Sequence, residues 1–178
     1  GDVYKRQPYY NREYNRYAQT GYGMPNCVAY AYGRVYEMND EQPLITRGNA
    51  GEWWFINKRN NYYEYGSTPK LGAVVVWSNH VAVVEEINND GTITISESHY
   101  GGTYFNTKTV KDYTYHYGQK FYGFIYTYKE PEPSKNYTAQ ETITTPEAQQ
   151  VFSIIQLESD AQTDRIVHND KMLLLASA

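Results

Sequence analysis

Asn26-Cys27-Val28-Ala29-Tyr30-Ala31 and His80-Val81-Ala82-Val83-Val84-Glu85 are the two stretches of this chain that decide its fold. Glycine and proline residues at 21–25 mark a turn immediately before the first stretch. Residues 27–38 contain no proline, and apolar side chains recur there near helical spacing, at Val28, Tyr32, Val35 and Met38. The sequence therefore predicts that Cys27 lies at or near the N-terminus of a helix.

The second stretch lies in a region with the pattern of an antiparallel sheet. We expect a short buried strand over 72–77 and two further strands over 80–87 and 92–98. The latter two are separated by Asn-Asn-Asp-Gly at 88–91, and Asp-Gly between apolar runs is a strong hairpin signal. If the paired residue numbers add up to an odd number, the even-numbered residues of 80–84 share a face with the odd-numbered residues of 93–97. His80 and Glu97 then lie at the same end of the hairpin, within diagonal reach.

These residues together suit nucleophilic chemistry. Cys27 is the only cysteine, so it cannot form an internal disulfide. A helix N-terminus favours negative charge, and from this we expect a lowered thiol pKa. In this hypothesis Cys27 attacks a carbonyl, His80 acts as the base and Glu97 orients His80. The alternative is purely structural: free cysteines are often small buried hydrophobes, and a histidine at the start of a strand often has no catalytic role.

The residues also carry a resemblance to a known family. The stretch from about 21 to 128 resembles a CHAP domain, the cysteine, histidine-dependent amidohydrolase/peptidase family of phage endolysins and bacterial autolysins. The matching pieces are Asn-Cys-Val-Ala-Tyr-Ala at 26–31, Arg-Gly-Asn-Ala at 47–50 with Trp-Trp at 53–54, Gly-Ser-Thr-Pro at 66–69, Gly-Ala-Val-Val-Val-Trp at 72–77, His-Val-Ala-Val-Val-Glu at 80–85 and Ser-Glu-Ser at 96–98.

The resemblance implies an α+β, papain-like fold, in which N-terminal helices pack on an antiparallel sheet and the cysteine starts a helix. It implies peptidoglycan hydrolysis, either by an N-acetylmuramoyl-L-alanine amidase or by an endopeptidase of the stem or cross-bridge. By position, Cys27 would be the nucleophile, His80 the base and Glu97 the third member, while Asn26 would lie near the oxyanion hole. No cofactor is implied.

Two positions depart from the pattern of the family. His80 follows Asn79 where a glycine is usual, which would change the loop into that strand. His99 stands where many members have an asparagine. Three alternatives follow: Glu97 alone orients His80, His99 joins the network, or His99 only lines the groove. We favour Glu97, since an ionised carboxylate is the better acceptor for an imidazolium.

Metal ligation is not predicted. The region before Cys27 lacks an Asp-x-Asp run of hard oxygen ligands for calcium. His80, His99 and His116 could in principle bind a metal, but their spacing matches no recognisable ligand motif.

Composition adds a prediction about the aromatic residues. The chain has 21 tyrosines in 178 residues, many in runs at 62–65, 113–117 and 122–128. Because strands favour tyrosine on half-buried surfaces, we expect most of them to pack there, with one or two lining a groove. Trp53 and Trp54 are expected in the core first and in a groove second.

The charge changes along the chain. Residues 1–129 hold 13 basic and 12 acidic residues, and residues 130–178 hold 3 basic and 8 acidic, which together give the net charge of −4. There is no basic patch for nucleic acid and no apolar run long enough to span a membrane. The resemblance implies bacterial peptidoglycan as the partner, and action outside the cell or at the cell wall, by a protein that is either secreted or phage-encoded and released at lysis. We expect a monomer.

The predicted organisation has four parts. Residues 1–7 resemble translated adaptor sequence and are taken as a non-native leader. Residues 8–129 form the catalytic domain, and the proline-bearing polar stretch at 130–150 is a linker. Residues 151–178 are a partial C-terminal segment, the start of a wall-binding module or a docking tail.

Two other functions remain open. A related papain-like or NlpC-type peptidase would act on a different peptide. A non-catalytic wall-binding or virion structural module would have retained the fold without the activity.

Overall fold

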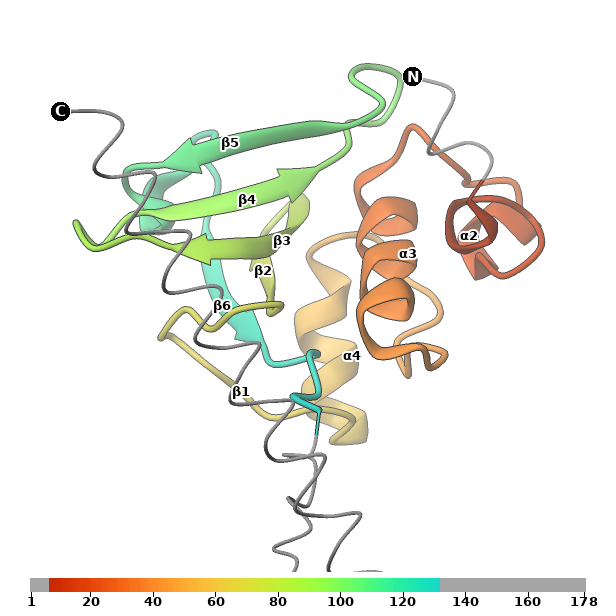
Figure 1. The fold of residues 1–178 in the computed structure, drawn as a ribbon, viewed down its shortest axis with the longest axis horizontal. Helices are drawn as coiled ribbons and strands as arrows, with labels where there is room; N and C mark the ends of the chain where they lie inside the picture. Colours follow the sequence, from red (N-terminus) through yellow and green to blue (C-terminus); the bar gives the residue numbers. More distant parts are fainter. Residues whose placement is uncertain (1–6, 132–178) are drawn as a thin grey trace, which may run out of the picture. The chain divides into compact units, whose positions relative to one another are not determined.

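The computed structural model describes residues 7–131, and this part holds an α+β fold (Figure 1). Of the predicted leader, linker and C-terminal segment, only Gln7, Glu130 and Pro131 fall inside it. Its helices are η1 (Pro8–Tyr10), α2 (Arg16–Gln19), α3 (Cys27–Asn39), α4 (Glu52–Asn60) and η2 (Tyr113–Tyr115). Its strands are β1 (Tyr65–Gly66), β2 (Val74–Trp77), β3 (His80–Ile87), β4 (Ile93–Glu97), β5 (Asn106–Val110) and β6 (Phe121–Ile125).

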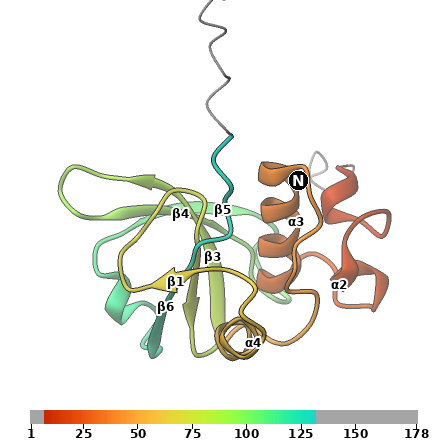
Figure 2. The ribbon, with the colours of Figure 1, turned by 90° about the horizontal axis from the view of Figure 1, so that it is seen from below.

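One antiparallel sheet of six strands, in the order β1-β6-β2-β3-β4-β5, forms half of the domain. Helices α2, α3 and α4 precede every strand in the chain and lie together beside the sheet (Figures 1 and 2). This segregation of helices from an antiparallel sheet defines an α+β architecture. The papain-like arrangement implied by the resemblance is confirmed. None of the helices in residues 7–131 is long and apolar enough to cross a membrane.

Helix α3 begins at Cys27, as predicted, because the residue before it is a good N-cap. The Oδ1 of Asn26 accepts a hydrogen bond from the backbone N–H of Val28 at 3.0 Å. The helix ends where Asp40 adopts a left-handed conformation with φ of 49°. Val28, Tyr32 and Val35 are buried against the core, and Met38 packs at its edge. The predicted helical spacing is therefore confirmed.

The predicted hairpin and its register are confirmed at the end that carries His80. Val83 pairs with Ser96 and Val84 with Ile95, so the residue numbers add up to an odd number. Farther along the strands a bulge shifts the register between Val84 and Glu86. The bulge lies toward the 88–91 turn, so it leaves the relation between His80 and Glu97 unchanged.

A two-residue turn, Ser78 and Asn79, delivers His80 to the start of β3. Trp77 pairs with His80 across this turn, and the backbone N–H of Asn79 donates to the side chain of Gln119 at 3.0 Å. The turn is also anchored by the backbone N–H of Ser78, which donates to Lys120 at 2.8 Å. Asn79, where a glycine is usual in the family, thus sits in a turn braced by the segment before β6.

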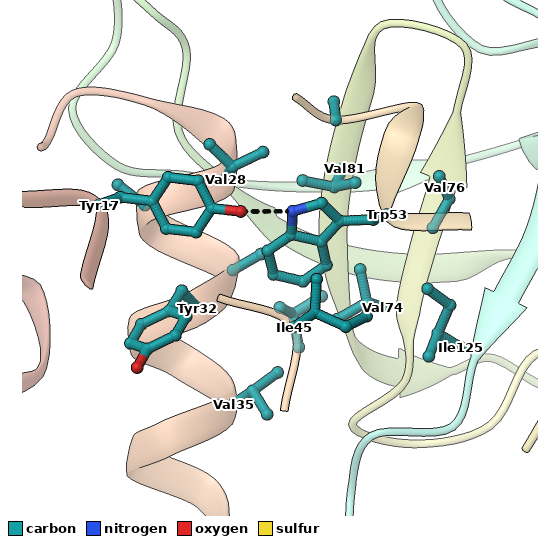
Figure 3. Close-up of a cluster of buried hydrophobic side chains, with 14 of the residues drawn as sticks. Tyr17, Val28, Tyr32, Val35, Ile45, Trp53, Val74, Val76, Val81 and Ile125 are labelled. Carbon is teal, nitrogen blue, oxygen red and sulfur yellow. Dashed lines mark hydrogen bonds between the residues drawn. The ribbon is translucent and has the colours of Figure 1, made fainter. Parts of the chain in front are cut away.

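Figure 3 shows the core between α3, α4 and the sheet. Trp53 of α4 is 1% exposed and lies between α3 and the valines of β2 and β3. Its indole N–H donates to the hydroxyl of Tyr17 at 2.7 Å, which satisfies the polar atom of a buried tryptophan. Trp54 is only partly buried. The core interpretation is therefore confirmed for Trp53, and this contact fixes α4 against α2.

The prediction that most tyrosines pack on strands is wrong for the buried ones. Tyr10, Tyr17, Tyr30 and Tyr32 are the tyrosines of the described core, and all four lie in helices. They stack with one another, as in the pair Tyr10 and Tyr30 at 5.6 Å. Aromatic pairing between helical segments has outweighed the strand preference of the residue.

A close backbone contact joins α4 to the turn before His80. A side-chain carbon on Gly51 would collide with the backbone carbonyl of Ser78. We predict that Gly51→Ala lowers the free energy of unfolding by about 1–3 kcal/mol, because two backbones must separate. In the control, Gly102→Ala, the added carbon would lie 3.5 Å from His99, an ordinary contact, and the change should stay within about 0.5 kcal/mol. Urea unfolding of both variants measures this, and equal stabilities would contradict it.

Candidate functional site

A cavity of about 660 Å³ opens where the start of α3 meets the start of β3. Cys27 and His80 both line it, from the helix and from the sheet respectively. The remaining lining residues are Tyr22, Asn26, Val28, Asn49, Ala50, Asn79, His99, Tyr100, Tyr117 and Gln119. Four of the five predicted site residues therefore line one cavity, and the fifth, Glu97, lies behind it with no exposed surface.

Cys27 is partly buried against the backbone of β3. Burial raises the pKa of the thiol, and the backbone N–H groups of Val81, Val28 and Cys27 itself oppose that rise. The prediction that the helix N-terminus lowers this pKa is wrong, because desolvation of the sulfur outweighs those N–H groups. A thiolate at this position therefore depends on a base that accepts its proton.

His80, which lines the same cavity as Cys27, is the candidate for that base. Its Nε2 lies 2.8 Å from Oε2 of Glu97, and the two residues are 4% and 0% exposed. Because Nε2 is engaged with the carboxylate, Nδ1 is the nitrogen left for another partner. Val81 is the next residue along the strand, and its backbone N–H hydrogen bonds to the sulfur of Cys27. The start of β3, which carries His80, therefore lies against the thiol. The shared cavity and this backbone contact are what make His80 the candidate acceptor for the proton of Cys27.

Glu97 receives more donors than the sequence suggested. Its Oε1 accepts hydrogen bonds from Asn106 Nδ2 at 2.9 Å and from the hydroxyl of Tyr117 at 2.8 Å. Burial alone would raise the pKa of this carboxyl. The hydrogen bonds from His80, Asn106 and Tyr117 and the charge of His80 outweigh burial and lower the pKa to about 2. Glu97 is therefore a fixed negative charge behind His80.

His99 joins this network and also lines the cavity, which agrees with the second of the three alternatives. Its Nε2 lies 3.1 Å from Oε1 of Glu97. Extending the register of Val83 and Ser96 places His99 opposite His80, and their rings stack at 4.9 Å with 7° between the planes. Glu97 still makes the shorter contact to His80, through its other oxygen.

Asn26 is held in place from two sides. Its Oδ1 caps α3, and its backbone N–H donates to Ser98 Oγ at 3.0 Å. Because Oδ1 is occupied, the Nδ2 amide group remains as a donor at the cavity wall.

Asn106 and Tyr117 were missed by the sequence analysis. Asn106 begins β5, and Tyr117 follows η2 with φ of 54°, an unusual conformation for a tyrosine. Neither position carries a periodic signal, and both lie in a segment rich in tyrosine and threonine. Only the pairing of β5 with β4, which sets Asn106 opposite Glu97, brings the first of them to the site.

His80, Glu97 and His99 are also the group in the described ranges whose ligand atoms lie close enough, within 4.8 Å, to hold a metal ion. His116, considered with them from the sequence, is not part of it. The hydrogen bonds to Glu97 account for the closeness of these atoms.

The fold and the cavity define a class: a papain-like α+β domain with a cysteine at a helix start facing a histidine and a buried carboxylate on the sheet. Comparison with known sequences gives the family. Residues 16–99 match the model of the CHAP domain. The resemblance to the CHAP family is therefore confirmed over residues 16–99.

The relatives are staphylococcal. The chain is 35% identical over 92 residues to a Staphylococcus aureus protein named "Probable autolysin LDP" and 31% identical over 86 residues to one named "Probable autolysin SsaALP". These matches cover 49% and 46% of this chain and 32% of each relative. The chain thus spans about a third of the length of these relatives.

Among solved structures, the chain resembles N-acetylmuramoyl-L-alanine amidase from Staphylococcus aureus, with 32% identity and a TM-score of 0.41. The match covers 50% of this chain and 29% of the amidase.

The raised thiol pKa leads to a prediction about alkylation. We expect His80→Ala to slow the reaction of Cys27 with iodoacetamide at pH 7 by about tenfold or more, because the buried thiol loses its proton acceptor. His116→Phe is the control, since His116 does not line the cavity. Mass spectrometry follows the single thiol over time, and an unchanged rate in His80→Ala would show that His80 does not act on it.

His116 predicts how stability depends on pH. Burial lowers the pKa of His116 to about 4, and no group in residues 7–131 hydrogen bonds to its buried Nε2. The folded state therefore holds the neutral ring, and stability is lost as pH falls from about 6.5 to about 4, while the unfolded chain takes up a proton. His116→Phe should remove up to about 3 kcal/mol of this loss, measured as free energies of urea unfolding at pH 7, 5.5 and 4. If the free energy of unfolding changed equally with pH in the wild type and in His116→Phe, this prediction would be wrong.

Proposed function

We propose that this protein hydrolyses an amide bond of bacterial peptidoglycan through a Cys-His-Glu thiol mechanism. The match to the CHAP domain and the relatives named as autolysins support a peptidoglycan hydrolase. The observation that carries the mechanism is the single cavity lined by Cys27 and His80, with the ionised carboxylate of Glu97 2.8 Å behind the imidazole.

In the first half of the proposed reaction, Nδ1 of His80 takes the proton of Cys27, and the sulfur attacks the carbonyl carbon of the substrate. Glu97 stabilises the imidazolium that forms and fixes its orientation. The oxyanion would accept hydrogen bonds from the backbone N–H of Cys27 and from Nδ2 of Asn26. His80 then gives its proton to the leaving nitrogen, which departs as an amine and leaves a thioester on Cys27.

Water completes the proposed reaction. His80 removes a proton from a water molecule, the hydroxide attacks the thioester carbonyl, and the carboxylic acid leaves as the sulfur is released. An amidase and an endopeptidase would share every one of these steps. The bond cleaved therefore depends on how the substrate lies in the cavity.

The same proposal covers organisation and place of action. Residues 8–129 would be the catalytic domain, 130–150 a linker and 151–178 a partial C-terminal segment, either the start of a wall-binding module or a docking tail. The substrate is an extracellular polymer, so the protein would act at the cell wall. The staphylococcal relatives include one named as a secretory antigen, which supports secretion.

Turbidity loss of purified Gram-positive cell walls tests the function. We expect clearing by the wild type and a loss of at least about 10³-fold in Cys27→Ala, since no other group can form the thioester. His116→Phe is the matched control and should retain activity. Mass spectrometry of the fragment ends then names the bond.

Three outcomes would contradict the proposal. Equal clearing by wild type and Cys27→Ala would exclude the thiol mechanism. No clearing of walls of any chemotype, together with wall binding by a folded protein, would instead favour the non-catalytic module. Cleavage of peptides unrelated to walls would favour the NlpC-type alternative.

A further inference from the structure

A second hollow, of about 390 Å³, adjoins the cavity of Cys27. Tyr22, Asn26, Val28 and Asn49 line both, so the two share one wall. A substrate bound at Cys27 that extends past Asn26 therefore enters this hollow. It is formed by α2, by the residues before α4 and by the first turn of α4.

Two guanidinium groups, of Arg16 and Arg47, line this hollow. Both side chains are exposed, and within residues 7–131 neither forms an ion pair. Arg16 makes one long hydrogen bond, 3.4 Å to Gln19, and so remains available. Arginine is the side chain best suited to bind a carboxylate, through two parallel N–H donors.

One acid, Glu52, also lines the hollow, but its charge is already engaged. Its Oε2 accepts the backbone N–H of Asn49 at 2.7 Å, and it lies in the first turn of α4, where a negative charge is favourable. The two arginines therefore leave the hollow with a surplus of positive charge. Apolar groups and neutral sugars would gain no binding energy from that positive charge.

We propose that this hollow is a subsite for a free carboxylate of the peptide being cleaved, bound by Arg16 and Arg47. The inference rests on the proposed function and deepens it: the substrate class is a stem peptide that carries an ionised carboxylate near the scissile amide. Peptides in which that carboxylate is converted to a carboxamide bind less well, since a neutral amide offers one weaker acceptor to a guanidinium.

The test uses the full chain and two forms of one substrate. Soluble muropeptides, released from Gram-positive walls by a muramidase, are used as prepared and after carbodiimide coupling of their carboxylates to excess ammonia. For the wild type we expect kcat/KM to be about tenfold higher on the free acids, the loss expected for charge-assisted hydrogen bonds. The double variant Arg16→Gln/Arg47→Gln should lose that preference through a higher KM, with kcat unchanged.

Two controls separate this effect from others. Arg59→Gln removes one positive charge from an exposed site on α4 outside the hollow and should keep the wild-type preference. Arg16→Lys/Arg47→Lys should restore part of it, because the charge returns without the paired donors. Thermal unfolding of each variant checks that the exposed substitutions leave the fold intact.

The outcomes are distinct. Equal cleavage of both substrate forms by the wild type, or a preference that survives in the double glutamine variant, overturns the subsite and leaves the proposed function standing. Cleavage of neither form by the wild type overturns the proposed function itself.

Discussion

Glu97 is a charged side chain with no exposed surface, and the rest of the site depends on how that charge is held. A buried carboxylate is costly unless it is paired and hydrogen-bonded. Its partners come from three segments: His80 from β3, Asn106 from β5 and Tyr117 from the loop before β6. Since all three must be in place before Glu97 is stable as an anion, assembly of the sheet and of the site are one event. A sheet out of register would bury an uncompensated charge.

The helical half of the site has a different physical basis. Asn26 fixes the start of α3 through its cap, and the packing of Trp53 against Tyr17 fixes α4 and α2 around it. This packing brings Cys27 against the backbone of β3 but also strips water from the sulfur, which raises the pKa of the thiol. In the proposed mechanism, position and reactivity are therefore supplied by different elements: the helix places the sulfur, and the imidazole on the sheet accepts its proton.

Local pattern was enough to predict the start of α3, the strand His80–Ile87 and the register that joins His80 to Glu97. Each depends on residues close in sequence: a cap fixes the start of the helix, alternation marks the strand, and a turn sets the register. Asn106 and Tyr117 could not be predicted, because their contacts with Glu97 follow from strand pairing and from a loop without periodicity. The pKa of Cys27 was predicted with the wrong sign for a related reason: the helix N-terminus is visible in the sequence, whereas desolvation depends on what packs over the sulfur.

The net charge of the chain also differs in sign from the charge around the proposed subsite. The net charge of −4 gives no electrostatic attraction to an anionic wall, and the acidic excess lies in residues 130–178. Screening limits the reach of exposed charges to about 8 Å at physiological salt, so a bound peptide responds mainly to the charged groups around it and hardly to the net charge of the chain. Beside Cys27 those groups are Arg16 and Arg47, with Glu52 engaged by the backbone. A chain with a net negative charge can therefore select a negatively charged peptide, provided that the available cations line the groove.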